Sequence, residues 1–188
     1  EQPLGASHMG LIYVNPQGPD ANPDPLLAAH DIRETFGRMA MNDYETAALV
    51  AGGHTFGKSH GAASESYKGP DPEASKLQDQ STGWNSGYKS GKGVDTISSG
   101  IEGAWTQNPT KWDMGYLDCL YGHDWELTKS PAGAHQWTPK KNGQKIKMVP
   151  DAHQKGVLHP PMMQTTDISM KVDPSYGPIT NHFHQNPK

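Results

Sequence analysis

The sequence predicts a mainly α-helical fold with long loops, and three observations lead to this prediction. An apolar stripe at helical spacing follows Asp24 and Pro25, and a second apolar run leads up to Gly52 and Gly53. Residues 61–100 are instead rich in glycine and serine, which is the composition of a loop. The chain contains neither an internal repeat nor the glycine fingerprint of a dinucleotide-binding unit after a strand.

The first helix is predicted over residues 25–41. Asp24 suits the cap position before a helix, and Pro25 suits the first helical position because the N–H that it lacks would be unpaired there. The apolar residues that follow fall on one helical stripe: Ala28, Ile32, Phe36 and Met39.

The second helix is predicted over residues 44–51, which are apolar on most sides. We expect this helix to be buried and to stop at Gly52 and Gly53, because glycine commonly ends a helix. His54 would then project from the end of a buried helix. Taken alone, a histidine at such a place is either an iron ligand or a polar residue at a helix end.

The remaining segments give weaker signals. Residues 61–100 are predicted to be irregular, and 138–161 to form a surface connection. A short helix is expected at about 113–121, and residues 165–177 are compatible with either a short strand or the start of a helix.

Composition limits the functions that this chain can have. The formal net charge of -4 provides no basic surface for nucleic acid or an anionic membrane, and no apolar run approaches the ~20 residues that span a bilayer. The one cysteine, Cys119, cannot form an internal disulfide, which favours a reducing compartment and a cytoplasmic location. Its apolar neighbours predict a buried, inert thiol. His182 and His184 are expected to be solvated rather than metal-binding.

The balance of residue types also bears on domain organisation. A hydrophobic fraction of 33%, together with 21 Gly and 16 Pro, predicts a weak core. We therefore expect the 188 residues to be a segment of a longer protein.

Six ordered blocks of the sequence resemble the bacterial-type catalase-peroxidases, a branch of the plant-type haem peroxidases. The blocks are "MGLIYVNPQGP" (9–19), "DIRETFGRMAMND" (31–43), "GGHTFGKSHGA" (52–62), "SGIEGAWTQNPTKWD" (99–113), "YGHDWELTKSPAGAHQW" (121–137) and "TTDISMKVDP" (165–174). The resemblance implies a haem-peroxidase-like helical domain that binds haem b. It also implies a homodimeric enzyme that decomposes hydrogen peroxide to water and oxygen, or reduces it with a small electron donor.

The resemblance implies three residues on the proximal side of the haem. His54 would be the axial ligand of the haem iron, Asp167 would accept a hydrogen bond from its ring N–H, and Trp105 would pack beside the imidazole and share the carboxylate. A histidine whose second nitrogen is bonded to a carboxylate is a stronger electron donor to iron, which suits peroxide cleavage. Without the resemblance, Asp167 would be interpreted as a cap or turn residue and Trp105 as part of the core.

Further cofactor contacts follow from the same resemblance. It implies that Lys58, His60 and Ser99 lie on the side of the haem propionates, because cations and donors stabilise a buried carboxylate. Ser99 would also lie at the narrow part of the access channel. We assign Gly53 and Gly57 to the cofactor site as well, since a residue without a Cβ lets a flat group approach closely. Taken singly, Lys58 is more simply a solvated lysine and Ser99 a loop serine.

Tyr13 and Met39 match the tyrosine and methionine that catalase-peroxidases join covalently to a distal tryptophan, an adduct associated with catalase activity. The distal Arg-x-x-Trp-His block itself does not occur in the 188 residues. We therefore expect residues 1–188 to be the proximal half of the N-terminal haem-binding domain, without the distal block or the C-terminal domain. This segment alone should be inactive, because moving a proton between the peroxide oxygens needs a distal histidine.

Two alternatives to this interpretation stay open. One is a haem peroxidase of the same superfamily without catalase activity. The other is a haem-free structural fragment, which the presence of His54, Trp105 and Asp167 argues against.

Overall fold

The fold is seen in a computed structural model that describes residues 13–61, 63–79, 83–140 and 146–187. Its helices and strands, in chain order, are α1 (Pro25–Gly37), α2 (Asp43–His54), α3 (Gly115–Gly122), β1 (Trp125–Lys129), β2 (His135–Pro139), β3 (Val149–Pro150), β4 (Leu158–His159), α4 (Thr165–Val172) and α5 (Tyr176–Gln185). The mainly helical prediction is therefore confirmed. None of the helices in the described residues is long and apolar enough to cross a membrane.

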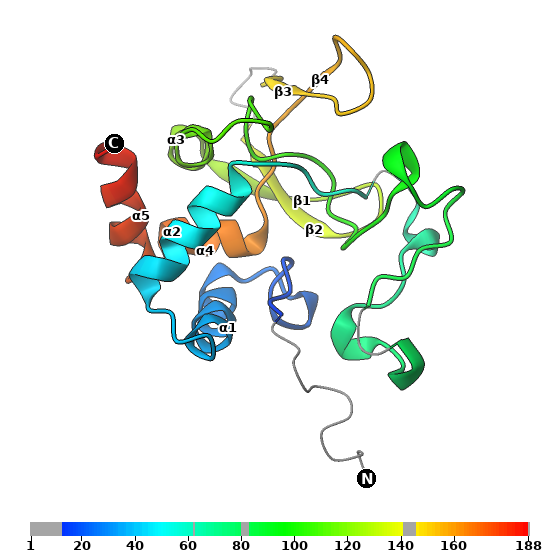
Figure 1. The fold of residues 1–188 in the computed structure, drawn as a ribbon, viewed down its shortest axis with the longest axis horizontal. Helices are drawn as coiled ribbons and strands as arrows, with labels where there is room; N and C mark the ends of the chain where they lie inside the picture. The colour runs from blue at the N-terminus through cyan, green and yellow to red at the C-terminus, as the bar shows by residue number, and fades with distance from the viewer. Residues whose placement is uncertain (1–12, 62, 80–82, 141–145, 188) are drawn as a thin grey trace.

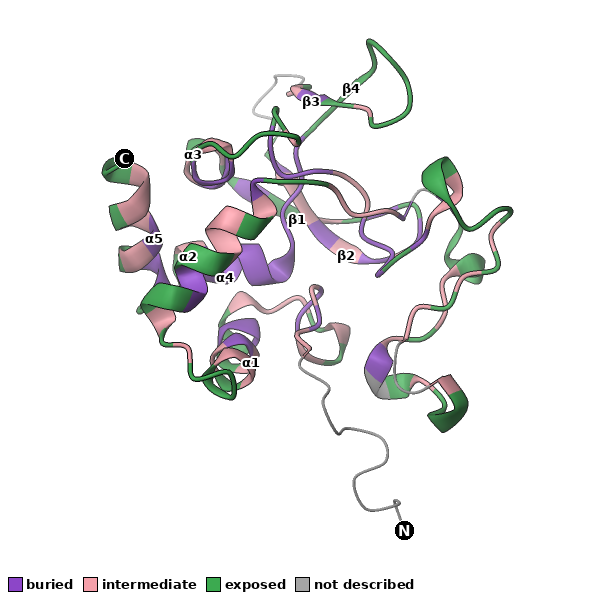
Figure 2. Ribbon diagram, in the orientation of Figure 1, coloured by how far each residue is buried: buried purple, intermediate pink, exposed green. Residues whose placement is uncertain are grey.

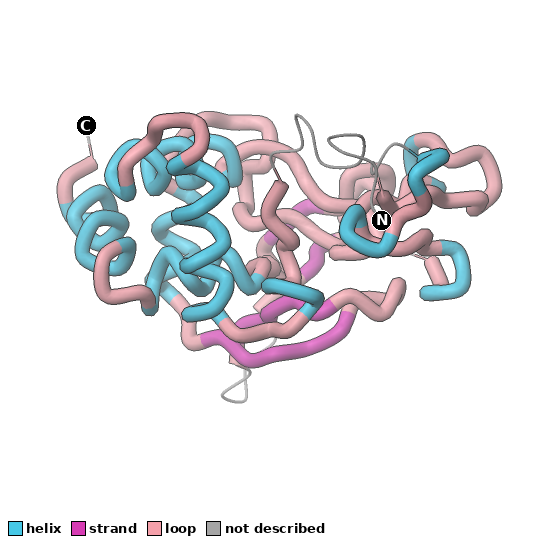
Figure 3. The backbone as a smooth tube through the Cα atoms, turned by 90° about the horizontal axis from the view of Figure 1, so that it is seen from below, coloured by secondary structure: helices cyan, strands magenta, loops and turns pink. Residues whose placement is uncertain are grey.

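The helices and the loops occupy opposite sides of the molecule. Figure 1 shows α1, α2, α4 and α5 grouped on one side, while the segment between α2 and α3 extends beyond the β1–β2 hairpin on the other. Figure 3 shows the same division from a perpendicular direction. In its described part, the segment 61–100 contains only short 3₁₀ turns and isolated bridges, so the prediction of an irregular region is confirmed.

The first helix begins where the sequence predicts and ends earlier. The Asp24 carboxylate accepts hydrogen bonds from the N–H groups of Leu26 and Leu27, which caps α1 as expected. The predicted extension to residue 41 is wrong. The N–H groups of Met39 and Met41 donate to the Phe36 carbonyl, and Ala40 takes a left-handed backbone conformation with φ of 59°. Met39 consequently leaves the buried stripe and is 38% exposed.

The second helix continues through the glycine pair that was predicted to end it. A reciprocal capping box between Asn42 and Glu45 starts α2, and the helix runs on through Gly52 and Gly53 to His54. The predicted stop was wrong because glycine inside a helix costs only about 1 kcal/mol relative to alanine, which packing and a good cap can offset. The helix is also less buried than expected, since only Thr46 and Ala47 along it are buried.

A β-hairpin, absent from the prediction, follows α3. Strands β1 and β2 pair antiparallel, with Trp125 opposite Pro139 and Lys129 opposite His135. The Trp137 backbone also exchanges two hydrogen bonds with Met163, which attaches the hairpin to the segment leading into α4. Both strands are five residues long, too short for their alternation to be recognised in the sequence.

Helix α4 is the central element of the helical side. Residues 165–170 are all buried, and Figure 2 shows α4 as the most completely buried helix of the group. Helices α1 and α5 pack against it, and α5 also contacts α2 and α3. The ambiguous region 165–177 is therefore helical, with α5 beginning at Tyr176 after a short break. Helix α5 was not predicted, because its polar sequence contains few apolar residues.

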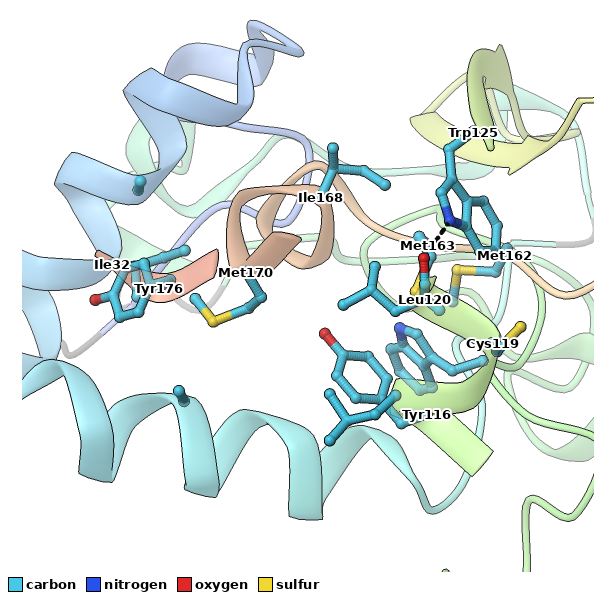
Figure 4. Packing of buried hydrophobic residues seen from close by; sticks show 14 of the residues in the cluster. Ile32, Tyr116, Cys119, Leu120, Trp125, Met162, Met163, Ile168, Met170 and Tyr176 are labelled. Carbon is cyan, nitrogen blue, oxygen red and sulfur yellow. Dashed lines mark hydrogen bonds between the residues drawn. The ribbon is translucent and has the colours of Figure 1, made fainter. Parts of the chain in front are cut away.

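Apolar side chains from α1, α3, α4 and the hairpin form one core. Figure 4 shows part of it, with Tyr116 of α3 pointing toward α4 and the Trp125 indole bonded to the Leu120 carbonyl. Cys119 is buried as expected.

Arg33 joins α1 to both α2 and the end of α4. Its guanidinium bonds the Asp43 carboxylate at 2.9 Å and the Asp173 carboxylate, and it lies 4.5 Å above the Tyr176 ring. Burial alone would raise the pKa of Asp173. Hydrogen bonds from Arg33 and from the backbone N–H groups of Tyr176 and Ser175 together lower it by more than burial raises it, so the pKa lies below its ordinary value. The Asp173 carboxylate is thus ionised and paired at neutral pH.

Removing the Arg33 side chain should loosen the junction between α4 and α5. We expect Arg33→Ala to lower the local stability by about 1–2 kcal/mol, a moderate value because the side chain is 39% exposed. Hydrogen exchange of a peptide covering residues 173–181, in the protein at its full natural length, measures this loss. Arg38→Ala is the control, because the exposed pair of Arg38 with Glu34 should contribute about 0.5 kcal/mol or less. Equal exchange rates in the two variants would contradict the prediction.

The Cys119 thiol should be chemically silent in the folded protein. Burial raises its pKa to about 12, and the Asp118 carboxylate adds to the shift. We expect iodoacetamide at pH about 8.5, where a free thiol is about half ionised, to leave the Cys119 peptide unmodified. The same peptide should be labelled fully in concentrated urea, as read by mass spectrometry. Rapid labelling without urea would show that the thiol is accessible.

Candidate functional site

The Asp167 carboxylate, in the first turn of α4, is fully buried. Its Oδ1 accepts hydrogen bonds from His54 Nδ1 at 2.7 Å and the Tyr116 hydroxyl at 2.9 Å, and its Oδ2 accepts from Trp105 Nε1 at 2.6 Å and the Gln164 backbone N–H at 2.8 Å. The bond from Gln164 is the carboxylate side of a capping box, so the start of α4 also fixes the position of the carboxylate. Each oxygen has two donors, which stabilises the buried negative charge.

His54 is the last residue of α2, and its ring is held on two sides. Since the carboxylate can only accept, Nδ1 carries the proton and donates it to Asp167. The imidazole also stacks on the Trp105 indole, with ring centroids 4.3 Å apart and 17° between the planes. In the neutral imidazole Nε2 then carries the lone pair, and it makes no hydrogen bond with any residue that the structure describes. The side chain is 28% exposed.

Trp105 lies in the loop before α3 and is almost fully buried. Its position is fixed by hydrogen bonds of the two residues next to it in the sequence. The Ala104 carbonyl accepts from the Met162 N–H at 3.1 Å, and the Thr106 hydroxyl donates to the Thr55 carbonyl at 3.4 Å, just beyond α2. The loop that presents the indole is thereby attached to the end of the helix that presents the imidazole.

Tyr116 is the member of the site that sequence reasoning missed. It lies in the first turn of α3, is 1% exposed, and its ring meets the His54 ring edge-on with centroids 5.8 Å apart. Burial, followed by the negative charge of Asp167, raises the pKa of Tyr116 well above its ordinary value, so the phenol remains a donor. Its sequence neighbours gave no sign of this role, because one tyrosine in a short apolar helix is ordinarily core.

The residues around His54 fit a metal-bound cofactor. A cavity of about 140 Å³ lies beside the imidazole and has mostly apolar walls, formed by Val14, Ile32, Phe36, Val50, Gln164, Thr166 and Met170. An imidazole with one nitrogen fixed by a carboxylate and the other free is the usual state of a histidine ligand. These features suit His54 as a metal ligand, and its ligation of a haem iron stays a prediction.

The two glycines assigned to the cofactor leave open space. A Cβ placed on Gly53 or on Gly57 would meet no atom within 4 Å. Gly57 also has a φ of 82°, which favours glycine, and its N–H donates to the Pro109 carbonyl at 2.7 Å. Both glycines thus border open space, and their assignment to the cofactor site stays a prediction.

The residues predicted for the propionate side have protein partners of their own. Lys58 Nζ lies 2.6 Å from a Glu102 carboxylate oxygen, a pairing that the sequence did not indicate. Burial, and next the positive charge of Lys58, lowers the pKa of His60, so this imidazole is neutral at pH 7. Ser99 is buried. Their contact with a propionate stays a prediction.

Tyr13 and Met39 both lie near the C-terminal end of α1. The Tyr13 carbonyl accepts from the Thr35 hydroxyl at 3.3 Å, and the Tyr13 ring meets the Trp84 ring edge-on with centroids 5.4 Å apart. Met39 follows α1 and is partly exposed. The covalent adduct predicted for these two residues stays a prediction.

A buried carboxylate that holds a histidine at the end of a helix through Nδ1 is an arrangement suited to a metal-ligating histidine. The family model described as "Peroxidase" matches residues 7–186, so the chain belongs to the peroxidase family.

The relatives are more specific than the family model. The chain is 62% identical over 189 residues to the catalase-peroxidase of Koribacter versatilis and 61% identical over 186 residues to that of Gloeobacter violaceus. These alignments cover 100% and 98% of this chain, and 25% of each relative. The resemblance inferred from the six blocks is therefore confirmed, and the chain spans about a quarter of the length of these relatives.

Replacing Asp167 by an amide should destabilise the site. The variant Asp167→Asn offers one acceptor oxygen to four donors and turns an N–H₂ group toward one pair of them. We expect a loss of about 3 kcal/mol or more, because buried donors are left unpaired. Thermal unfolding of the protein at its full natural length measures it. Asp118→Asn, the same change at an exposed carboxylate of α3, is the control and should be close to neutral. A similar melting temperature for both variants would contradict the prediction.

Proposed function

We propose that the protein to which this chain belongs is a haem-dependent catalase and peroxidase. In this proposal it decomposes hydrogen peroxide to water and oxygen, or reduces it with a small electron donor. The observation that carries the proposal is the arrangement of His54 between the Asp167 carboxylate and the Trp105 ring, with its second nitrogen free. Membership of the peroxidase family and the identity to catalase-peroxidases support it.

Each residue of the arrangement has a distinct task. Haem b, when bound, supplies the iron at which peroxide is reduced. His54 would hold the iron through Nε2, while Asp167 holds the proton on Nδ1 and would increase the electron donation of the ring. Trp105 stacks on the imidazole, fixes its plane and excludes water from the hydrogen bond. Lys58, His60 and Ser99 would hold the propionates of the cofactor.

The proposal includes the covalent adduct of Tyr13 and Met39 with a distal tryptophan. This adduct is what would distinguish a catalase-peroxidase from a peroxidase without catalase activity. Tryptic peptide masses of the protein at its full natural length separate the two alternatives. A crosslinked peptide containing both residues favours catalase activity, and two unmodified peptides favour the monofunctional enzyme.

We also propose that residues 1–188 are part of the N-terminal haem-binding domain and contain its proximal half. The proposed holoenzyme is a homodimer. The single cysteine is compatible with a cytoplasmic location.

The variant His54→Ala tests the axial ligand. Absorption spectra of the protein at its full natural length should show a Soret band with a high-spin ferric signature, and this signature should be lost in the variant. Added imidazole should restore it, since the exogenous base can occupy the space left by the side chain. His182→Ala, which alters an exposed histidine of α5, is the matched control and should leave the spectrum unchanged. A normal spectrum in His54→Ala would overturn the assignment, and no Soret band in the wild type would overturn the function.

A further inference from the structure

The Oδ1 atom of Asp167 is shared between two donors. It accepts from His54 Nδ1 at 2.7 Å and from the Tyr116 hydroxyl at 2.9 Å. The other two donors bond Oδ2. Tyr116 therefore competes with His54 directly, whereas Trp105 and the Gln164 backbone act on the other oxygen.

Tyr116 is placed for this contact by the start of α3. The Gly115 N–H donates to the Asp113 side chain at 2.8 Å, and the Asp113 carbonyl accepts from the Thr55 hydroxyl at 3.3 Å, one residue beyond His54. A side chain at Gly115 would collide with Asp113, so the chain approaches closely here. Figure 4 shows the Tyr116 hydroxyl pointing toward α4, away from its own helix. Among the described residues, the hydroxyl has Asp167 as its one hydrogen-bond partner.

A carboxylate oxygen divides its electron density among the donors that it accepts. Hydrogen bonds in a buried network are coupled, so that a second donor on the same oxygen weakens the first. The strength of the bond from His54 Nδ1 governs the electron density at Nε2, the atom that the proposed function assigns to the iron.

We propose that Tyr116 is a positioning residue that weakens the His54–Asp167 hydrogen bond and thereby limits electron donation from His54 to the haem iron. The inference rests on the proposed function, because it concerns the same axial ligand. Tyr116 touches neither cofactor nor substrate in this role, and it acts through the shared Oδ1 atom.

The experiment compares Tyr116→Phe with the wild type in the haem-loaded protein at its full natural length. Without the hydroxyl, Asp167 keeps three donors and none of them is left unpaired. The His54 bond should strengthen, so the iron–histidine stretching frequency in the resonance Raman spectrum of the ferrous protein should rise. The ferric-to-ferrous equilibrium constant should fall on the order of threefold, less than one whole hydrogen bond would give, because the other donors remain.

The matched control is Tyr121→Phe in the same helix. The Tyr121 hydroxyl bonds Thr180 and the Gly177 carbonyl, and neither of these belongs to the carboxylate network. This variant loses the same atom in the same element, and its stretching frequency and redox equilibrium should equal those of the wild type.

A second substitution reverses the sign of the effect. Genetic incorporation of 3-fluorotyrosine at position 116 keeps the hydroxyl and makes it a stronger donor, so the stretching frequency should fall below that of the wild type. This variant also preserves the contact with Asp167 should Tyr116→Phe fold poorly.

Two outcomes would overturn the inference. The first is a Tyr116→Phe variant that is less stable but has an unchanged stretching frequency, which would give the hydroxyl a purely structural role. The second is a shift of the frequency in the same direction in the fluorinated and phenylalanine variants. Either result leaves the proposed function intact, because the wild type still shows a Soret band that depends on His54. Loss of that dependence would contradict the proposed function itself.

Discussion

The rest of the structure depends on the buried Asp167 carboxylate. A negative charge taken out of water costs several kcal/mol unless hydrogen-bond donors replace the solvent, and here four donors do so. They come from the end of α2, the loop before α3, the first turn of α3 and the start of α4. The longest of these connections spans 113 residues of sequence. Because no one segment satisfies the charge alone, the fold and the site form together.

The same carboxylate couples the groups around it. It bonds the imidazole and the phenol through one oxygen, and the indole through the other. A change in any one donor alters the strength of the other hydrogen bonds to Asp167. When the bond from His54 Nδ1 changes, the electron density at the free nitrogen, Nε2, changes with it. Stability and chemistry thus have a common origin, since the bonds that stabilise the buried charge also set the donor strength of the proposed ligand.

The sequence predicts local features well and tertiary ones poorly. The start of α1 was predictable because Asp24 caps it and apolar residues repeat along it. The end of α2 was not, since packing and capping outweigh the glycine preference at Gly53. In the site, the roles of Trp105 and Asp167 followed from the family resemblance and not from composition. Tyr116 escaped notice because its role exists only once α3 lies against α4.

The network also explains why the two sides of the imidazole differ. Behind it, Asp167, Trp105 and Tyr116 are almost entirely buried. In front, Nε2 has no hydrogen-bond partner among the described residues, and Gly53 borders open space. In the proposed function this half of a site would hold and tune an axial ligand, but cleaving peroxide also requires a group that moves a proton on the opposite face. The chain spans about a quarter of the length of its catalase-peroxidase relatives. We therefore propose that the acid–base half is supplied by sequence outside that quarter, and that His54 becomes catalytically useful when the two halves enclose the cofactor.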